Sequence, residues 1–200
     1  MGLMALPLQP DPDHAPPWWR AAVLLVGMAV ALAAFGVIGA VRHHPAELLV
    51  SGAGEPLTYA RAAERMIAGA QRRVWVLQYV VRPDENGPVD GLMAALAAAA
   101  ARGVEVRVVL DRGVLFGTTD RDPKNDDAAA WFTAHGVPLL WDEADRTSHA
   151  KVLVVDDAAL VGSHNWTRMA LIDNREVSVR LSEPRLINEL CAMFRAIPGF

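Results

Sequence analysis

The sequence predicts an α/β fold with a mixed, mostly parallel central sheet and helices on both faces of that sheet, preceded by one transmembrane helix. Three observations carry this prediction. The chain has 200 residues, of which 52% are hydrophobic and 21% charged, which suits one globular domain and excludes a disordered chain. From residue 45 onward, β-branched segments alternate with segments of helical periodicity. Residues 21–41 form an uninterrupted apolar run.

The apolar run predicts a membrane segment. Residues 21–41 contain no charged or polar side chain, and a helix of that length spans about 30 Å at about 1.5 Å per residue, the thickness of a bilayer core. In the N-terminal tail, residues 1–20, Trp18 and Trp19 stand beside Arg20, as at a membrane–water boundary. We expect an uncleaved anchor, with a cleaved signal segment as the alternative.

The flanking charges and the cysteine content bear on the side of the membrane where the domain lies. Arg20 and Arg42 flank the run, one on each side, so the positive-inside rule favours neither orientation. The single cysteine, Cys191, tolerates either compartment and excludes an intramolecular disulfide. We expect the following domain, residues 45–200, to lie outside the cytoplasm, and to be secreted if the segment is cleaved.

Strands and helices follow in order along this domain. Short segments rich in β-branched residues predict strands: residues 74–81, 104–110, 137–141, 150–155, 159–161 and 176–181. Helical spacing of apolar residues predicts helices: residues 57–71, 92–102, 126–135 and 184–197. The glycine-bearing segment 112–123 leaves a strand end, where open α/β sheets bind ligands, so we expect it near a site.

Polar chemistry is concentrated after residue 148. His149 and Lys151 are two residues apart on a predicted strand, so their side chains project from the same face. An ammonium group suits phosphoryl oxygens, and an imidazole can attack or protonate. After a turn, Ser163 and Asn165 bring a hydroxyl and an amide back toward this pair. Strand parity sends Asp156 to the other face.

This constellation resembles a known signature. The chain is similar to the phospholipase D superfamily over residues 45–200, most of all to its small single-motif endonucleases and their membrane-anchored relatives. The resemblance rests on an HKD motif that here comprises His149, Lys151, Asp156, Gly162, Ser163 and Asn165.

The resemblance implies a role for each catalytic residue. His149 is expected to attack phosphorus and form a phosphohistidine intermediate. Lys151 and Asn165 are expected to bind the phosphoryl oxygens of the substrate, with Ser163 assisting. Glu176 matches the acidic residue that orients the nucleophile through its other ring nitrogen.

The remaining motif residues are expected to be structural. Asp156 would hold the hairpin, and Gly162 would permit close backbone approach. The resemblance implies neither a metal nor another cofactor. His164 occupies a variable position of the motif, and we expect it to fill that position without contacting substrate.

The mechanism implied by the resemblance needs two histidines with opposite roles, and this chain carries one motif. None of the histidines outside the motif is followed by a lysine two residues later. A second copy must therefore supply the other histidine, which predicts a homodimer with one shared site.

The substrate remains open between two classes. The first expectation is a nuclease with little sequence preference; the alternative is a phospholipid phosphodiesterase that the bilayer anchor, residues 21–41, keeps near headgroups. A less favoured possibility is an inactive, phosphate-binding membrane module. The formal charge of −4 and the presence of only two lysines, Lys124 and Lys151, argue against bulk attraction to nucleic acid.

Overall fold

A computed structural model of the chain describes residues 46–52, 57–113, 120–143, 145 and 147–200. The predicted tail and the predicted membrane segment, residues 21–41, lie outside the described residues. Within the described part, no helix is both long enough and apolar enough to cross a membrane.

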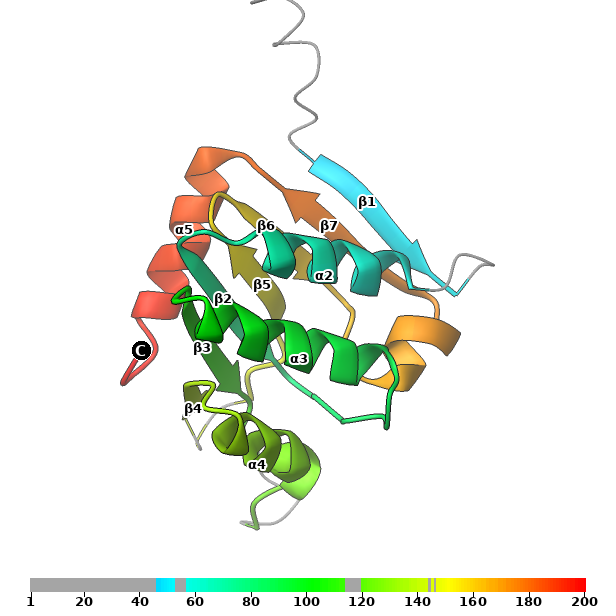
Figure 1. The fold of residues 1–200 in the computed structure, drawn as a ribbon, viewed down its shortest axis with the longest axis vertical. Coiled ribbons are helices and arrows are strands. Elements are labelled where there is room, and N and C mark those ends of the chain that lie inside the picture. Colours follow the sequence, from blue (N-terminus) through cyan, green and yellow to red (C-terminus); the bar gives the residue numbers. More distant parts are fainter. Residues whose placement is uncertain (1–45, 53–56, 114–119, 144, 146) are drawn as a thin grey trace, which may run out of the picture. The chain divides into compact units, whose positions relative to one another are not determined.

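One seven-stranded sheet organises the domain (Figure 1), in the order β1-β7-β6-β5-β2-β3-β4. Its strands in chain order are β1 (Ala46–Ser51), β2 (Arg73–Gln78), β3 (Glu105–Leu110), β4 (Leu139–Trp141), β5 (Lys151–Val155), β6 (Ala158–Gly162) and β7 (Glu176–Leu181). Six of these were predicted, with boundaries shifted by a few residues, whereas the edge strand β1 was not.

The mixed sheet is confirmed, but the expectation that it is mostly parallel is wrong. Only the β2–β3 and β3–β4 pairs are parallel, and the other four pairs are antiparallel. The reason lies in the connections, because parallel neighbours need a crossover segment whereas antiparallel neighbours can follow a short turn. After β4 the chain returns to place β5 beside β2 in the opposite direction, and Asp156 and Asp157 then turn it directly into β6.

Helices cover both faces, as predicted. The helices α2 (Thr58–Gly69), α3 (Pro88–Ala101) and α4 (Asp126–Ala134) pack on one face, and α5 (Pro184–Arg195) packs on the other (Figure 1). Two short helical turns, Pro123–Asn125 and Met169–Asp173, were not predicted.

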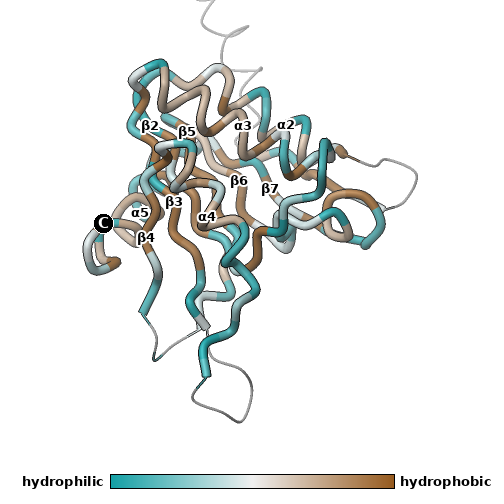
Figure 2. Tube along the Cα trace, turned by 60° about the horizontal axis from the view of Figure 1, so that its bottom comes forward, coloured by the Kyte–Doolittle hydropathy of each residue, from teal (hydrophilic) through white to brown (hydrophobic). Residues whose placement is uncertain are grey.

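Strand β2 is buried on both faces, because apolar side chains alternate between two cores. Val74 and Val76 belong to the core under α2 and α3, whereas Trp75 and Leu77 belong to the core under α5. Figure 2 shows the strands as the apolar centre of the domain and the connecting loops as hydrophilic. Burial of this kind supplies most of the folding free energy and gives the sheet edge a rigid base.

Strand register brings the predicted site residues to one edge of the sheet. Gln78, the last residue of β2, pairs with Leu110 at the end of β3 and with Lys151 at the start of β5. Two strands further along the sheet, Gly162 at the end of β6 faces Ser178 of β7. Residues close to these strand ends therefore share one edge.

Candidate active site

His149 and Lys151 lie side by side at the start of β5. His149 immediately precedes the strand and is exposed, whereas Lys151 is 5% exposed. The Lys151 Nζ atom lies 3.1 Å from His149 Nδ1 and donates a hydrogen bond of 2.6 Å to the His149 carbonyl oxygen. The structure thus brings the predicted nucleophile and the predicted phosphate-binding cation together.

Burial changes the pKa of Lys151. Loss of solvent lowers the pKa of Lys151 below its ordinary value, and attraction to Glu176 and Asp111 opposes part of that shift. A partly desolvated ammonium interacts more strongly with an anion than a hydrated one does. Lys151 is accordingly suited to stabilise negative charge beside His149.

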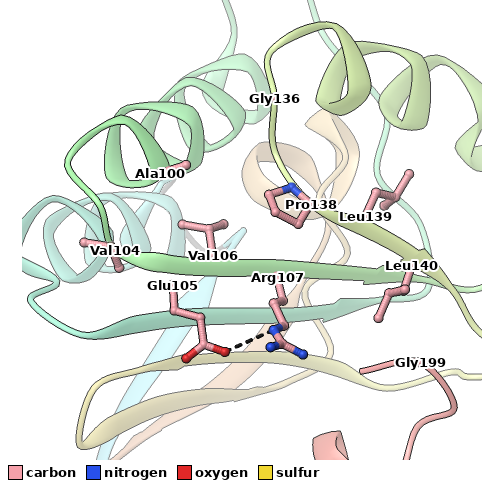
Figure 3. A pocket seen from close by; sticks show the side chains of 10 residues that line it. All are labelled: Ala100, Val104, Glu105, Val106, Arg107, Gly136, Pro138, Leu139, Leu140 and Gly199. Atoms are coloured by element: carbon pink, nitrogen blue, oxygen red, sulfur yellow. Dashed lines mark ion pairs between the residues drawn. The ribbon is translucent and has the colours of Figure 1, made fainter.

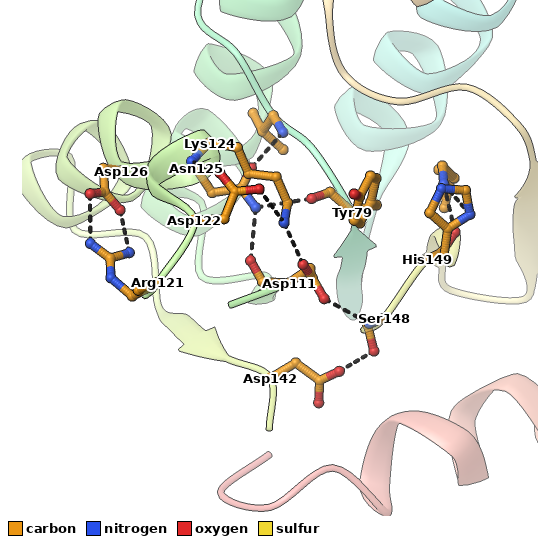
Figure 4. Close-up of polar contacts among 12 residues, drawn as sticks. Tyr79, Asp111, Arg121, Asp122, Lys124, Asn125, Asp126, Asp142, Ser148 and His149 are labelled. Atoms are coloured by element: carbon orange, nitrogen blue, oxygen red, sulfur yellow. Dashed lines mark hydrogen bonds and ion pairs between the residues drawn. The ribbon is translucent and has the colours of Figure 1, made fainter. Parts of the chain in front are cut away.

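Tyr79 supports the histidine and was not among the predicted site residues. The Tyr79 ring centroid lies 4.4 Å from the His149 ring centroid. The Lys151 Nζ atom lies 4.8 Å from the Tyr79 ring centroid. Figure 4 shows the Tyr79 ring beside His149, at the end of β2. Its position directly after a buried strand, at the edge where the motif lies, was the signal that could have identified it.

Ser163 and Glu176 form a second polar pair at the same edge. Ser163 Oγ donates to Glu176 Oε2 and accepts the N–H of Val177 at 3.0 Å. The other carboxylate oxygen, Oε1, accepts a 3.1 Å hydrogen bond from Asn174 Nδ2. Among the described residues, Glu176 is bonded to these groups and not to His149.

Two amide side chains at this edge have buried atoms without hydrogen-bond partners among the described residues. They are Asn165, through Oδ1, and the fully buried Gln78, through both amide atoms. Gln78 faces Lys151 across the β2–β5 pair. Asn165 is held beside the end of β2, because the backbone N–H of the next residue, Trp166, donates a hydrogen bond to the Val80 carbonyl oxygen. Unpaired buried polar atoms are costly and often mark functional positions.

Asp156 lies at the opposite end of β5. Its carboxylate accepts hydrogen bonds of 2.8–3.0 Å from the backbone N–H groups of Gln71, Arg72 and Arg73. Burial alone would raise the pKa of Asp156, but these three donors more than offset it and hold the pKa below its ordinary value. The structure therefore places Asp156 away from His149, in contact with the start of β2.

Gly162, at the end of β6, lies directly against the backbone of β7. A Cβ atom at this position would lie 2.2 Å from Ser178 Oγ and 2.4 Å from the Val177 carbonyl oxygen. Only glycine fits without moving one of the strands that carry Ser163 and Glu176.

His164 is a buried structural residue. Its Nδ1 and Nε2 atoms lie 2.7 Å from Ser178 Oγ and 3.0 Å from Ser51 Oγ, so it links β7 to β1. Burial lowers the pKa of His164 to about 4, with a smaller opposing effect from Glu176. It is fully buried, and the structure places no part of it at the exposed edge.

A pocket of about 460 Å³ adjoins His149. Its lining residues include His149, Ser148 and Asp142 together with apolar residues such as Leu77, Met193 and Ile197. A larger pocket, of about 610 Å³, lies against the first half of β3, and none of the predicted site residues lines it (Figure 3). Within the described ranges, no group of three or more His, Cys, Asp or Glu side chains is arranged to hold a metal ion.

Comparison with known proteins gives consistent matches. Residues 64–197 match the family model described as cardiolipin synthase, PLD-like domain. A probable cardiolipin synthase of Bacillus subtilis is 30% identical over 138 residues, 64% of this chain and 24% of that protein. Cardiolipin synthase A of Pseudomonas aeruginosa is 32% identical over 143 residues, 66% of this chain and 25% of that protein. The chain thus spans about a quarter of the length of these relatives.

Solved structures share the fold. Nuc of Salmonella typhimurium, a phospholipase D family member, superposes with a TM-score of 0.60 at 25% identity, covering 75% of this chain and 92% of that one. NucT of Helicobacter pylori superposes with a TM-score of 0.54 at 16% identity, covering 78% and 99%. The second is a likeness of fold alone.

Proposed function

The chain belongs to the phospholipase D superfamily, in the family of cardiolipin synthase, PLD-like domains, as its HKD motif led us to expect, and from this premise we propose that it is a metal-independent phosphodiester hydrolase. The observation that carries the proposal is the direct contact between His149 and Lys151 at an exposed sheet edge. An exposed imidazole can reach a substrate, and the adjacent cation can bind its phosphoryl oxygens.

In the proposed reaction, His149 Nε2 attacks phosphorus, and the bond from phosphorus to the leaving oxygen breaks. The leaving oxygen takes a proton from His149 of the partner subunit. Water then attacks the phosphohistidine, its proton passes to that second histidine, and the phosphorus–nitrogen bond breaks. We assign Lys151 and Asn165 to the phosphoryl oxygens, with Ser163 assisting through Glu176.

The two histidines need opposite proton positions. The histidine that protonates the leaving oxygen must be an imidazolium, with a proton on both ring nitrogens, and it becomes neutral when it gives up the Nε2 proton. The nucleophilic ring instead needs its proton on Nδ1, where we propose that Glu176 accepts it after Lys151 turns toward the substrate. A homodimer can hold one ring in each state.

Nucleic acid is the substrate that we propose first, cleaved with little sequence preference. Its support is the likeness in fold and sequence to Nuc over 92% of that chain. Phospholipid is the second candidate, and two observations favour it: the sequence similarity to cardiolipin synthases and the aliphatic lining of the pocket beside His149. An inactive phosphate-binding module is the least favoured candidate, because the polar residues of the motif are all present.

We further propose that residues 21–41 anchor the chain in a bilayer, with the domain outside the cytoplasm. The support is the length and uniformity of the apolar run. An anchored domain is compatible with either substrate.

The test offers the purified full chain single-stranded DNA, duplex DNA, RNA and phosphatidyl lipid vesicles, each in the presence of EDTA. We expect hydrolysis of one class, abolished by His149→Ala and retained by His135→Ala. His135 is a matched control, because it is exposed and stacks on Trp131 of α4, outside the site. Cleavage that stops with EDTA, or that survives His149→Ala, would contradict the proposal.

A further inference from the structure

Lys124 is a lysine that the proposed reaction does not use, yet its side chain is only 7% exposed. It belongs to the short helical turn Pro123–Asn125, before α4. Its Nζ atom lies 2.6 Å from Asp111 Oδ2 and 3.2 Å from Asp122 Oδ2. Burial would lower the pKa of Lys124, but the bonds to these two carboxylates raise it above the ordinary value, so the side chain is charged at neutral pH.

Asp111 connects this lysine to the backbone that leads into His149. The Asp111 side chain is fully buried at the end of β3. One carboxylate oxygen accepts from Lys124, and the other accepts the backbone N–H of Ser148 at 2.7 Å. Ser148 directly precedes His149, and its hydroxyl donates to Asp142, which anchors the same segment a second time (Figure 4).

Tyr79 makes a second connection between Lys124 and His149. The Lys124 Nζ atom lies 4.5 Å from the centroid of the Tyr79 ring, and that ring packs against the His149 ring. A cation over an aromatic face is attracted to it by about 0.5–2 kcal/mol, depending on solvation. Figure 4 shows Tyr79 between the two side chains.

The neighbouring Asn125 fixes where Lys124 stands. Its amide nitrogen donates 3.0 Å hydrogen bonds to the carbonyl oxygens of Tyr79 and Asp111, and its amide oxygen accepts the N–H of Val81 at 2.8 Å. The turn is therefore bonded to the ends of both β2 and β3. These three hydrogen bonds of Asn125 fix the turn from which the Lys124 side chain extends.

We propose that Lys124 is a positioning residue for His149, acting through Asp111 and Tyr79. The proposal rests on the proposed function of His149 as nucleophile. The ammonium of Lys124 already has two carboxylate partners, which favours a supporting role over a direct contact with the substrate phosphate. Without Lys124, the buried Asp111 carboxylate would lose the cation that is hydrogen-bonded to it, and the Ser148 segment and the Tyr79 ring would both lose a restraint.

Four full-length variants test this role. Lys124→Met removes the charge at nearly constant volume. Asp111→Asn combined with Lys124→Met removes both charges and keeps an amide oxygen for the Ser148 N–H. Asp111→Asn alone completes the double-mutant cycle of Lys124 and Asp111. Arg121→Met is the matched control, because Arg121 pairs with Asp126 near the same turn but is exposed.

On the substrate that the wild type hydrolyses, we expect Lys124→Met to lower kcat about 10- to 100-fold with KM within about twofold, because small misplacements of a reacting group cost that much. The double variant should regain most of the lost kcat, and Arg121→Met should match the wild type. If Lys124→Met does not fold, the comparison of the double variant with the wild type and with Asp111→Asn decides the question.

Three results would overturn the role: unchanged kcat and KM in Lys124→Met, a raised KM with unchanged kcat in that variant, or a double variant that folds but stays as slow as Lys124→Met. The last two would indicate direct contact with substrate. A second readout does not depend on activity, because the Tyr79 ring current shifts the NMR resonances of the His149 ring. These resonances should move in Lys124→Met and not in Arg121→Met. A wild type inactive on every substrate, with these resonances moved as expected, would contradict the proposed function and not the positioning.

Discussion

The imidazole of His164 stacks on the phenol ring of Tyr59, with centroids 4.5 Å apart and planes 12° from parallel. Both side chains are buried, and the two imidazole nitrogens are bonded to the hydroxyls of Ser51 and Ser178. The histidine of the G-S-H-N segment thus joins the edge strand β1 to the strand that carries Glu176. A proton on this ring would put a positive charge in the core that Glu176 offsets only in part.

Stability should therefore fall as the pH falls from about 6.5 to about 4. The folded-state pKa of His164 is about 4, whereas an unfolded histidine titrates near 6.5, so the unfolded chain binds the extra proton over this interval. The loss in free energy of unfolding should approach about 3 kcal/mol by pH 4. Urea unfolding at several pH values measures it. His164→Gln, which has no ionisable ring, should lack this slope, and a slope equal to that of the wild type would contradict the assignment.

Asp156→Asn should destabilise the fold, because the carboxylate holds three backbone N–H groups at the start of β2. We expect a loss of about 1–3 kcal/mol in the free energy of unfolding, measured by denaturant titration. Asp157→Asn is the control, since Asp157 makes an exposed ion pair with Arg72, and its effect should stay within about 0.5 kcal/mol. Equal effects of the two substitutions would refute a special role for Asp156.

Gly162→Ala should disturb both stability and activity. The added methyl group would meet the Val177 carbonyl oxygen and the Ser178 Cα atom, each within 2.4 Å, so β6 and β7 must separate near Ser163. Overpacking of this kind costs about 1–3 kcal/mol. Gly69→Ala, at the end of α2, meets nothing within 4 Å and should be neutral or slightly stabilising. Thermal melts and turnover rates compare the two variants; a Gly162→Ala protein as stable and active as Gly69→Ala would disprove the steric argument.

Mixed dimers test whether two chains share one site. Differently tagged wild-type and His149→Ala chains, co-expressed and purified through both tags, should form a species with almost no turnover, because each reaction needs both rings. The matching species made with His135→Ala should keep the wild-type rate. Half of the wild-type rate in the His149→Ala species would instead indicate independent sites.

Much of the fold followed from local patterns. Apolar β-branched runs such as residues 74–77 identify buried strands, and the two-residue spacing of His149 and Lys151 predicted their contact. Long-range pairing was less accessible. The antiparallel insertion of β5 beside β2 depends on which neighbour a strand finds, and the sequence of β5 has no preference that distinguishes the two directions.

Two contacts that were not predicted join residues that are separated in the sequence. Lys124 meets Asp111 across 13 positions, and His164 meets Ser51 across 113, so no local spacing indicates either contact. Strand β1 was missed for a related reason, because its six residues have one fully apolar stretch too short to distinguish a strand from a linker. Its identity comes from pairing with β7 along its whole length.

Because β1 is an edge strand of the sheet, its position also affects where recombinant fragments should begin. A fragment that follows the matched family region would begin at residue 64, inside α2, and would omit β1 entirely. The outer backbone groups of β7 would then be unsatisfied, and exposed sheet margins of this kind promote self-association of polypeptides. Truncations intended for crystallisation or assays should therefore start no later than Ala46.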